Sequence, residues 1–136
     1  MVKPIVKDVL FLARKSVPAD KGDVQVIADL RDTLAANREH CIGMAANMIG
    51  VSKRIIIVST ELGDMVMINP VIASKAGKYD TEEGCLSLVG VRKVQRFENI
   101  TVRYLDENFI ARKGKFSGLT AQIIQHECDH LEGIIV

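Results

Sequence analysis

Apolar residues recur at helical spacing in two stretches of the chain, residues 23–39 and 117–131. In the first stretch they are Val24, Ile27, Leu30 and Leu34. This spacing places them on one face of an α-helix, and Asp23 can cap its start. In the second stretch Ser117 can cap the start and Gly133 can end the helix. The pattern therefore predicts one helix at each of these two stretches.

Short apolar runs separated by turn residues occupy the region between the two predicted helices. Residues 54–59 and 65–69 flank the turn sequence Glu-Leu-Gly-Asp, which predicts a β-hairpin. Pro70 is expected to end the second strand, and a further short strand is expected at 71–74. Residues 100–105 alternate in polarity and predict another strand. The order of these elements predicts an α+β fold, with short antiparallel or mixed sheets around the C-terminal helix.

Length and composition fit one compact domain over residues 1–136. The chain is 48% hydrophobic and 26% charged, which excludes a disordered or low-complexity protein. Its formal net charge of +1 gives no reason to expect nucleic acid held by bulk charge. No apolar run is long enough to cross a bilayer, and charged residues interrupt residues 1–8, where a signal peptide would become apolar. We therefore expect a cytoplasmic protein without a membrane partner.

Histidine and cysteine are scarce, with three of each, and without a secretory signal three cysteines do not indicate a disulfide framework. Two histidines lie in the sequence His126-Glu127-Cys128-Asp129-His130, inside the second predicted helix. Residues four apart lie one above the other on a helix, so both imidazoles can bind one divalent ion. Glu127 is then placed to move a proton of the water that the ion activates. The alternative is an exposed polar helix face that carries two unrelated histidines.

A third metal ligand is expected upstream of the HExxH sequence. Only six residues follow His130, and Val136 stands where the longer metzincin pattern would have its third histidine. The upstream candidates are His40, Cys41, Glu82, Glu83 and Cys85. Cys85 is favoured because Gly84 lets the backbone approach closely and the apolar Leu86 helps to keep water out. A thiolate is also a stronger ligand than a carboxylate for a soft or borderline ion.

The remaining scarce residues have plainer interpretations. Cys128 falls away from the histidine pair on the helical wheel, so it is expected to be buried as a small apolar residue. Cys41 fits a substrate-facing loop or the core. His40 lies among charged residues at the predicted end of the first helix, and we expect it at the surface.

Three motifs in the sequence resemble those of the peptide deformylases, in the same order along the chain. The family's GxGxAAxQ-type loop corresponds to Cys41–Met48, its EGCLS segment to Glu83–Ser87, and its QHExDHLxG helix to Gln125–Gly133. The similarity extends over nearly the whole chain. It implies the peptide deformylase fold and a role in protein biosynthesis, in N-terminal methionine processing.

The resemblance also implies the chemistry of the site. Cys85, His126 and His130 would bind one divalent metal, ferrous iron in the cell, with zinc, nickel or cobalt able to take its place. Glu127 would move a proton from water to the departing amine, and the backbone N–H of Leu86 would help to hold the oxyanion. The substrate would be the N-terminal formyl-methionine of nascent peptides, at the ribosome, and the products would be formate and a free amine.

The substrate-binding residues are predicted partly from the helix pattern. Leu119 and Ile123 share a helical face with the two histidines, and with Ile42 they would form an apolar wall for the methionine side chain. The alternative is that Leu119 and Ile123 are ordinary core residues. By the resemblance, Gly43 would let the peptide backbone lie alongside as an added strand.

The sequence departs from the family at several positions. Met48 stands where the family has a glutamine whose amide supplies a second oxyanion donor, and a thioether has no donor. Cys41 replaces the first glycine of the loop, Val89-Gly90 replaces a usual Pro-Glu pair, and family members continue past the position of Val136. We therefore expect a deformylase whose activity is weakened or redirected. The alternatives are a hydrolase of another amide and a non-catalytic protein that binds peptide or metal.

Overall fold

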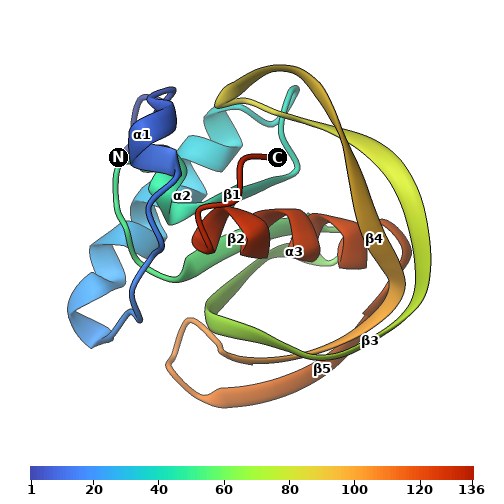
Figure 1. The fold of residues 1–136 in the computed structure, drawn as a ribbon. Helices are drawn as coiled ribbons and strands as arrows, with labels where there is room; N and C mark the ends of the chain where they lie inside the picture. The colour runs from blue at the N-terminus through green and yellow to red at the C-terminus, as the bar shows by residue number, and fades with distance from the viewer.

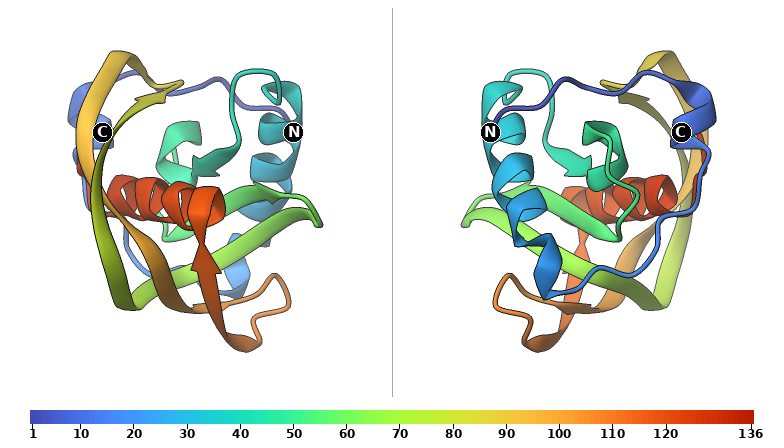
Figure 2. Two further views of the ribbon diagram at one scale, coloured as in Figure 1. Left: turned by 90° about the vertical axis from the view of Figure 1, so that its right-hand side faces the viewer. Right: turned by 90° about the vertical axis from the view of Figure 1, so that its left-hand side faces the viewer.

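The computed structural model describes residues 1–136. Its central feature is a five-stranded antiparallel sheet (Figure 1). Its strands are β1 (Gly43–Ala45), β2 (Ile55–Thr60), β3 (Gly63–Cys85), β4 (Leu88–Leu105) and β5 (Ala111–Ser117). Each strand pairs with the next in sequence, so β1 and β5 are the edges. The long strands β3 and β4 curve around the C-terminal helix α3 (Gly118–Leu131), which packs against β1, β2 and β4 (Figure 2). This α+β arrangement confirms the predicted fold class.

Strand β2 is covered by a helix on each of its two faces. Its residues Ile55 to Val58 are all fully buried, although a strand with one wet face would alternate. Ile55 and Ile57 pack in a core with α2 (Val24–Ala36), while Ile56 and Val58 pack in a second core with α3. The uninterrupted apolar run is therefore the signature of a strand that is covered on both faces.

The two predicted helices are confirmed, with differences at their ends. α2 begins at Val24 and ends at Ala36, earlier than predicted, where the Asn37 side chain donates to the Thr33 carbonyl at 2.8 Å. Asp23 holds the N-cap position but does not cap α2; its carboxylate instead accepts from the Asp20 N–H. That bond closes the short 3-10 helix η1 (Lys21–Asp23). The remaining short helices are α1 (Val9–Leu12) and η2 (Ala46–Ile49).

Helix α3 starts and stops as the sequence predicts. Ser117 occupies its N-cap position, although its side chain makes no capping hydrogen bond. Gly133 follows the helix with φ of 75°, a left-handed conformation that suits glycine. No helix of the structure is both long enough and apolar enough to span a membrane.

The prediction that Pro70 ends a strand is wrong. β3 continues through Pro70 to Cys85, with a shift in register between the pairs Ile68–Leu105 and Val71–Arg103. A bulge tolerates proline because the missing N–H falls where the ladder is already interrupted. Asn69, with φ of 51°, holds the bulge by bonding both the N–H and the carbonyl of Ala19. The strand expected at 71–74 is therefore part of β3.

Candidate metal centre and active site

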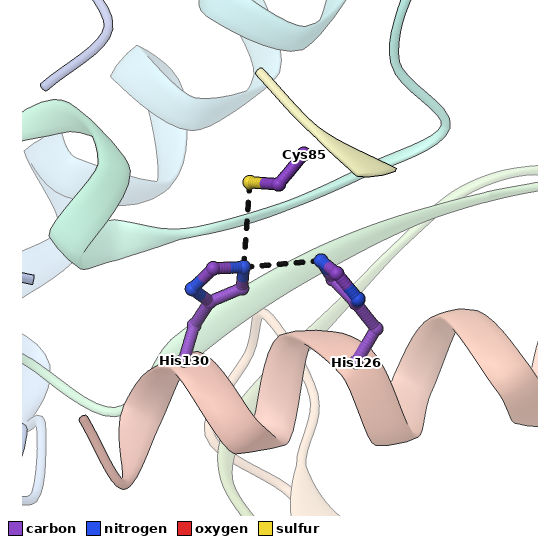
Figure 3. Close-up of side chains that lie close together, drawn as sticks. All are labelled: Cys85, His126 and His130. Atoms are coloured by element: carbon purple, nitrogen blue, oxygen red, sulfur yellow. Dashed lines mark hydrogen bonds between the residues drawn. The ribbon is translucent and has the colours of Figure 1, made fainter. Parts of the chain in front are cut away.

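Three potential metal ligands converge between α3 and the end of β3. His126 and His130 lie one turn apart on α3, and their Nε2 atoms are 3.1 Å apart. Cys85, the last residue of β3, places its Sγ 3.4 Å from the His130 Nε2 (Figure 3). The three ligand atoms lie within 4.8 Å of one another. The structure thus brings together the residues that the sequence singled out.

The donor set and its surroundings fit a divalent metal ion. Both histidines are buried, and the Nδ1 of His126 lies 2.7 Å from Glu83 Oε1. With the proton on Nδ1, the Nε2 lone pair of His126 is directed at the same point as His130 and Cys85. Two imidazoles and a thiolate are ligands for a borderline ion such as iron or zinc.

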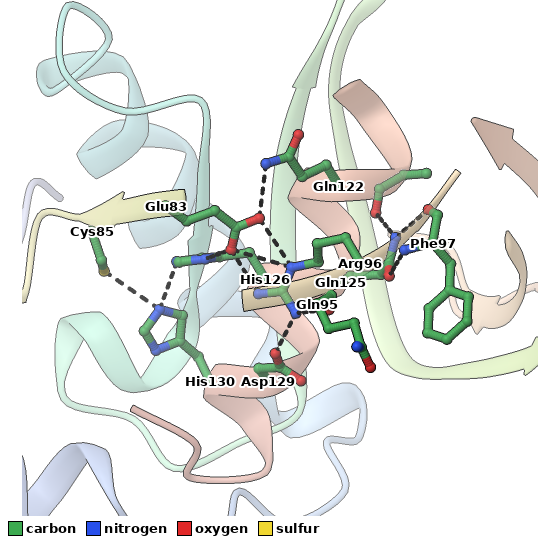
Figure 4. A network of polar contacts seen from close by, with 11 residues as sticks. Glu83, Cys85, Gln95, Arg96, Phe97, Gln122, Gln125, His126, Asp129 and His130 are labelled. Atoms are coloured by element: carbon green, nitrogen blue, oxygen red, sulfur yellow. Dashed lines mark hydrogen bonds and ion pairs between the residues drawn. The ribbon is translucent and has the colours of Figure 1, made fainter. Parts of the chain in front are cut away.

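Glu83 is the centre of a buried polar network behind the ligands (Figure 4). Besides His126, it accepts hydrogen bonds from the Arg96 guanidinium, at 2.6 Å from Nη2, and from the Gln122 amide at 2.9 Å. Arg96 also pairs with Asp129 on α3, at 2.7 Å. Burial raises the pKa of Glu83, but the bonds from His126, Arg96 and Gln122 outweigh it and lower the pKa to about 2. Glu83 therefore stays ionised near neutral pH, and its carboxylate orients the His126 ring.

Sequence reasoning missed most of this network. It considered Glu83 only as a possible third ligand, and it assigned no role to Arg96 or Gln122. Gln122 carries a usable signal, because it lies four residues before His126 and so on the same helical face. Arg96 carries none, since its proximity to Asp129 depends on how β4 crosses α3.

Glu127 lies next to the ligand group and is almost completely buried, at 4% exposure. Its Oε1 makes no hydrogen bond within the protein. Burial raises the pKa of Glu127 to about 7. A carboxyl group with a pKa near neutrality can both accept and release a proton.

A cavity of about 260 Å³ opens beside these residues. Cys85, Leu86, His126 and Glu127 line it, together with the four residues predicted to bind substrate, which are Ile42, Gly43, Leu119 and Ile123. Ile123 is buried, whereas Ile42 and Leu119 are exposed. All three apolar residues therefore border the cavity, and their contact with a methionine side chain stays a prediction.

Gly43 has a packing role that the sequence did not indicate. A Cβ at this position would lie 2.5 Å from Cγ2 of Ile123 and 3.1 Å from Oε2 of Glu127. Any larger residue would therefore push α3 or the Glu127 side chain away from β1. Glycine here allows the helix that carries Glu127 to approach the edge strand closely.

The other scarce residues and Met48 also have clear places. Cys128 is buried in the core between α3 and the sheet, as predicted. His40 is exposed, as predicted, and lines the cavity together with the half-buried Cys41. Met48 is 1% exposed and lines the same cavity with a thioether, which cannot donate a hydrogen bond.

Comparisons with known proteins identify the family. The polypeptide deformylase family model matches residues 2–136. The chain is 60% identical over 136 residues to the peptide deformylase of Clostridium beijerinckii, with all of both chains covered. It resembles the crystal structure of the Legionella pneumophila peptide deformylase at 32% identity and a TM-score of 0.89, covering 99% of this chain and 83% of the other.

A second solved structure carries a bound peptide. The Met-Ala-Ser-bound class I type b peptide deformylase of Acinetobacter baumannii matches at 30% identity and a TM-score of 0.89, covering 99% of this chain and 97% of the other. Sequence similarity over the full length and a shared fold thus accompany the Cys-His-His group. The chain belongs to the polypeptide deformylase family.

Proposed function

We propose that Cys85, His126 and His130 hold one divalent ion in this enzyme, and that Glu127 is its acid–base catalyst. The chain is a metal-dependent hydrolase that removes the formyl group from the N-terminal formyl-methionine of nascent peptides. The observation that carries the residue assignment is the convergence of the three ligand atoms beside a buried carboxyl group in one cavity. An ion bound there would supply Lewis-acid activation of the attacking water.

Glu127 would accept a proton from the attacking water and deliver it to the departing amine. Its burial beside the three ligand atoms, with one carboxyl oxygen free of any hydrogen bond within the protein, supports this role. The amine leaves as the C–N bond of the formamide breaks, and formate is the other product. Gly43 keeps this carboxyl group close to the edge strand.

The peptide would bind along the edge strand β1, with its methionine side chain against Ile42, Leu119 and Ile123. Strand β1 supports this because it pairs with β2 only, and its other edge is open to an added strand. The three apolar residues line the cavity beside Glu127. The Acinetobacter baumannii relative was solved with Met-Ala-Ser bound, which has the free methionine amine of a deformylated product.

The backbone N–H of Leu86 would donate to the oxyanion that forms on the formyl oxygen. Leu86 follows the proposed ligand Cys85 and lines the cavity, which supports this role. Met48 offers no second donor. We therefore propose that the chain turns over formylated peptides more slowly than a relative with glutamine at this position.

The variant Met48→Gln is expected to raise kcat for formate release, by up to about 10²–10³-fold, because one oxyanion donor typically contributes that much. Met48→Leu, which also lacks a donor, serves as the control and should leave kcat near the wild-type value. Stopped-time formate assays with formyl-Met-Ala-Ser measure both variants. A wild type that already matches Met48→Gln would contradict the role assigned to the missing amide.

Ferrous iron is the ion that we propose for the enzyme in the cell. The enzyme would act in the cytoplasm, on peptides that emerge from the ribosome. A thiolate ligand supports iron as well as zinc, nickel or cobalt. The test is formate release from formyl-Met-Ala-Ser by protein loaded without oxygen with Fe²⁺ or Zn²⁺. We expect turnover with both ions and faster turnover with iron. The activity of the iron-loaded protein should be lost in air, because the metal or the thiol is oxidised. Absence of formate with every metal would contradict the proposed function.

A further inference from the structure

The carbonyl of Gly43 faces the open edge of the sheet. The Ser59 N–H donates to the Ile42 carbonyl at 2.8 Å, so residues 42 and 59 form a hydrogen-bonded pair across β1 and β2. The next pair in register, Gly43 with Val58, is then a non-hydrogen-bonded pair. Both backbone polar groups of Gly43 therefore point away from β2, towards the side that no strand occupies.

This outward carbonyl already has a partner within the protein. The Cys41 thiol donates to it, with 2.7 Å between Sγ and the oxygen. Cys41 is half-buried, and both Cys41 and Gly43 line the cavity that holds Glu127. The thiol thus satisfies the backbone acceptor that an added peptide strand would meet on this edge.

We propose that Cys41 is a positioning residue that sets the affinity for the peptide by competing with it for the Gly43 carbonyl. The proposal rests on the proposed function, in which the peptide adds as a strand along β1. On this proposal a backbone N–H of the substrate approaches the Gly43 oxygen from the open edge, where the thiol lies 2.7 Å from it, and displaces the thiol. The family's loop motif has glycine at this position, which has no side chain to compete.

The size of the effect follows from the strength of the bond that is exchanged. A thiol is a weak donor, and a neutral hydrogen bond makes a modest net contribution. Removing the thiol should therefore tighten peptide binding about two- to five-fold. The effect should appear in Kd and KM, because the competition occurs when the peptide binds.

The experiment compares Cys41→Ala, which removes the donor, with Cys41→Ser, which keeps a hydroxyl donor. Titration calorimetry gives the Kd of Met-Ala-Ser, and formate release from formyl-Met-Ala-Ser gives kcat and KM. We expect Cys41→Ala to lower Kd and KM and Cys41→Ser to stay at or above the wild-type values. An unchanged or higher Kd in Cys41→Ala, or an equal fall in Cys41→Ser, would overturn the proposal.

A measurement on the wild-type protein tests the same exchange without relying on a variant. The infrared S–H band of the Cys41 thiol is identified by its absence from Cys41→Ser. This band should move to higher frequency when Met-Ala-Ser binds, because the hydrogen bond from the thiol to the Gly43 carbonyl is broken. A band that does not move would refute the exchange. Wild-type formate release is measured first: its absence contradicts the proposed function, whereas turnover with no change in Cys41→Ala contradicts only the role of Cys41.

Discussion

Replacing Glu127 by glutamine is expected to lower kcat for formate release by about 10²–10⁴-fold, the range that a positioned acid–base group contributes. Glutamine has nearly the same size and shape, so the close approach to Gly43 should be kept, but its amide cannot take a proton from water. Because Glu127 is not one of the three converging ligands, the variant should still bind one metal ion per chain. Formate assays and elemental analysis of the same sample measure the two quantities.

The matched control for this variant is Glu61→Gln, which makes the same chemical change at an exposed turn between β2 and β3. It should leave both kcat and metal content at the wild-type values. If Glu127→Gln kept turnover close to that of the control, another group would have to move the proton. If it lost the metal along with the activity, Glu127 would be a ligand and the assigned role would be wrong.

Replacing Arg96 by methionine is expected to lower the free energy of unfolding by about 3–5 kcal/mol, the typical cost of removing one partner of a buried ion pair. Arg96 and Glu83 have side-chain exposures of only 5% and 7%, and methionine would fill much of the space without the charge. The Glu83 carboxylate would then stay buried with only His126 and Gln122 as partners. Urea unfolding in metal-free buffer measures the change.

The same substitution should also weaken metal binding, by up to about 10–100-fold, because Arg96 holds the Glu83 carboxylate that orients His126 and loss of such support has effects of this size. Competition with a chromogenic chelator gives the metal Kd. Arg112→Met is the control: Arg112 pairs with Asp106 at the surface, where ion pairs contribute little, so its unfolding midpoint and metal Kd should hardly change. If Arg96→Met left the unfolding midpoint and the metal Kd as little changed as Arg112→Met does, the role assigned to the buried network would be wrong.

The sequence predicts the helices and the histidine pair well because both are local features. The spacing of His126 and His130 places them on one face of α3, and Gly133 marks its end. Cys85 lies 41 residues earlier than His126 by their numbers, and it was favoured from the glycine and leucine beside it. Contact over that separation depends on where β3 ends, which periodicity does not reveal.

Features that depend on distant parts of the chain could not be predicted in this way. Arg96 lies outside the strands that the sequence predicts, yet it is 4% exposed because β4 carries it between Glu83 and Asp129. Pro70 follows the usual rule for ending a strand, but Asn69 and Ala19 together hold a bulge that lets β3 continue. In both cases a long-range contact overrides the local preference.

The most direct test of the account is a crystal structure of the metal-loaded enzyme with anomalous diffraction recorded at the absorption edge of the metal. We expect one anomalous peak per chain, within coordination distance, about 2.0–2.3 Å, of Cys85 Sγ and of the Nε2 atoms of His126 and His130. Glu127 should lie beside that peak without binding it. A peak at other side chains, or none at these three in protein that releases formate, would contradict the assignment of the metal centre.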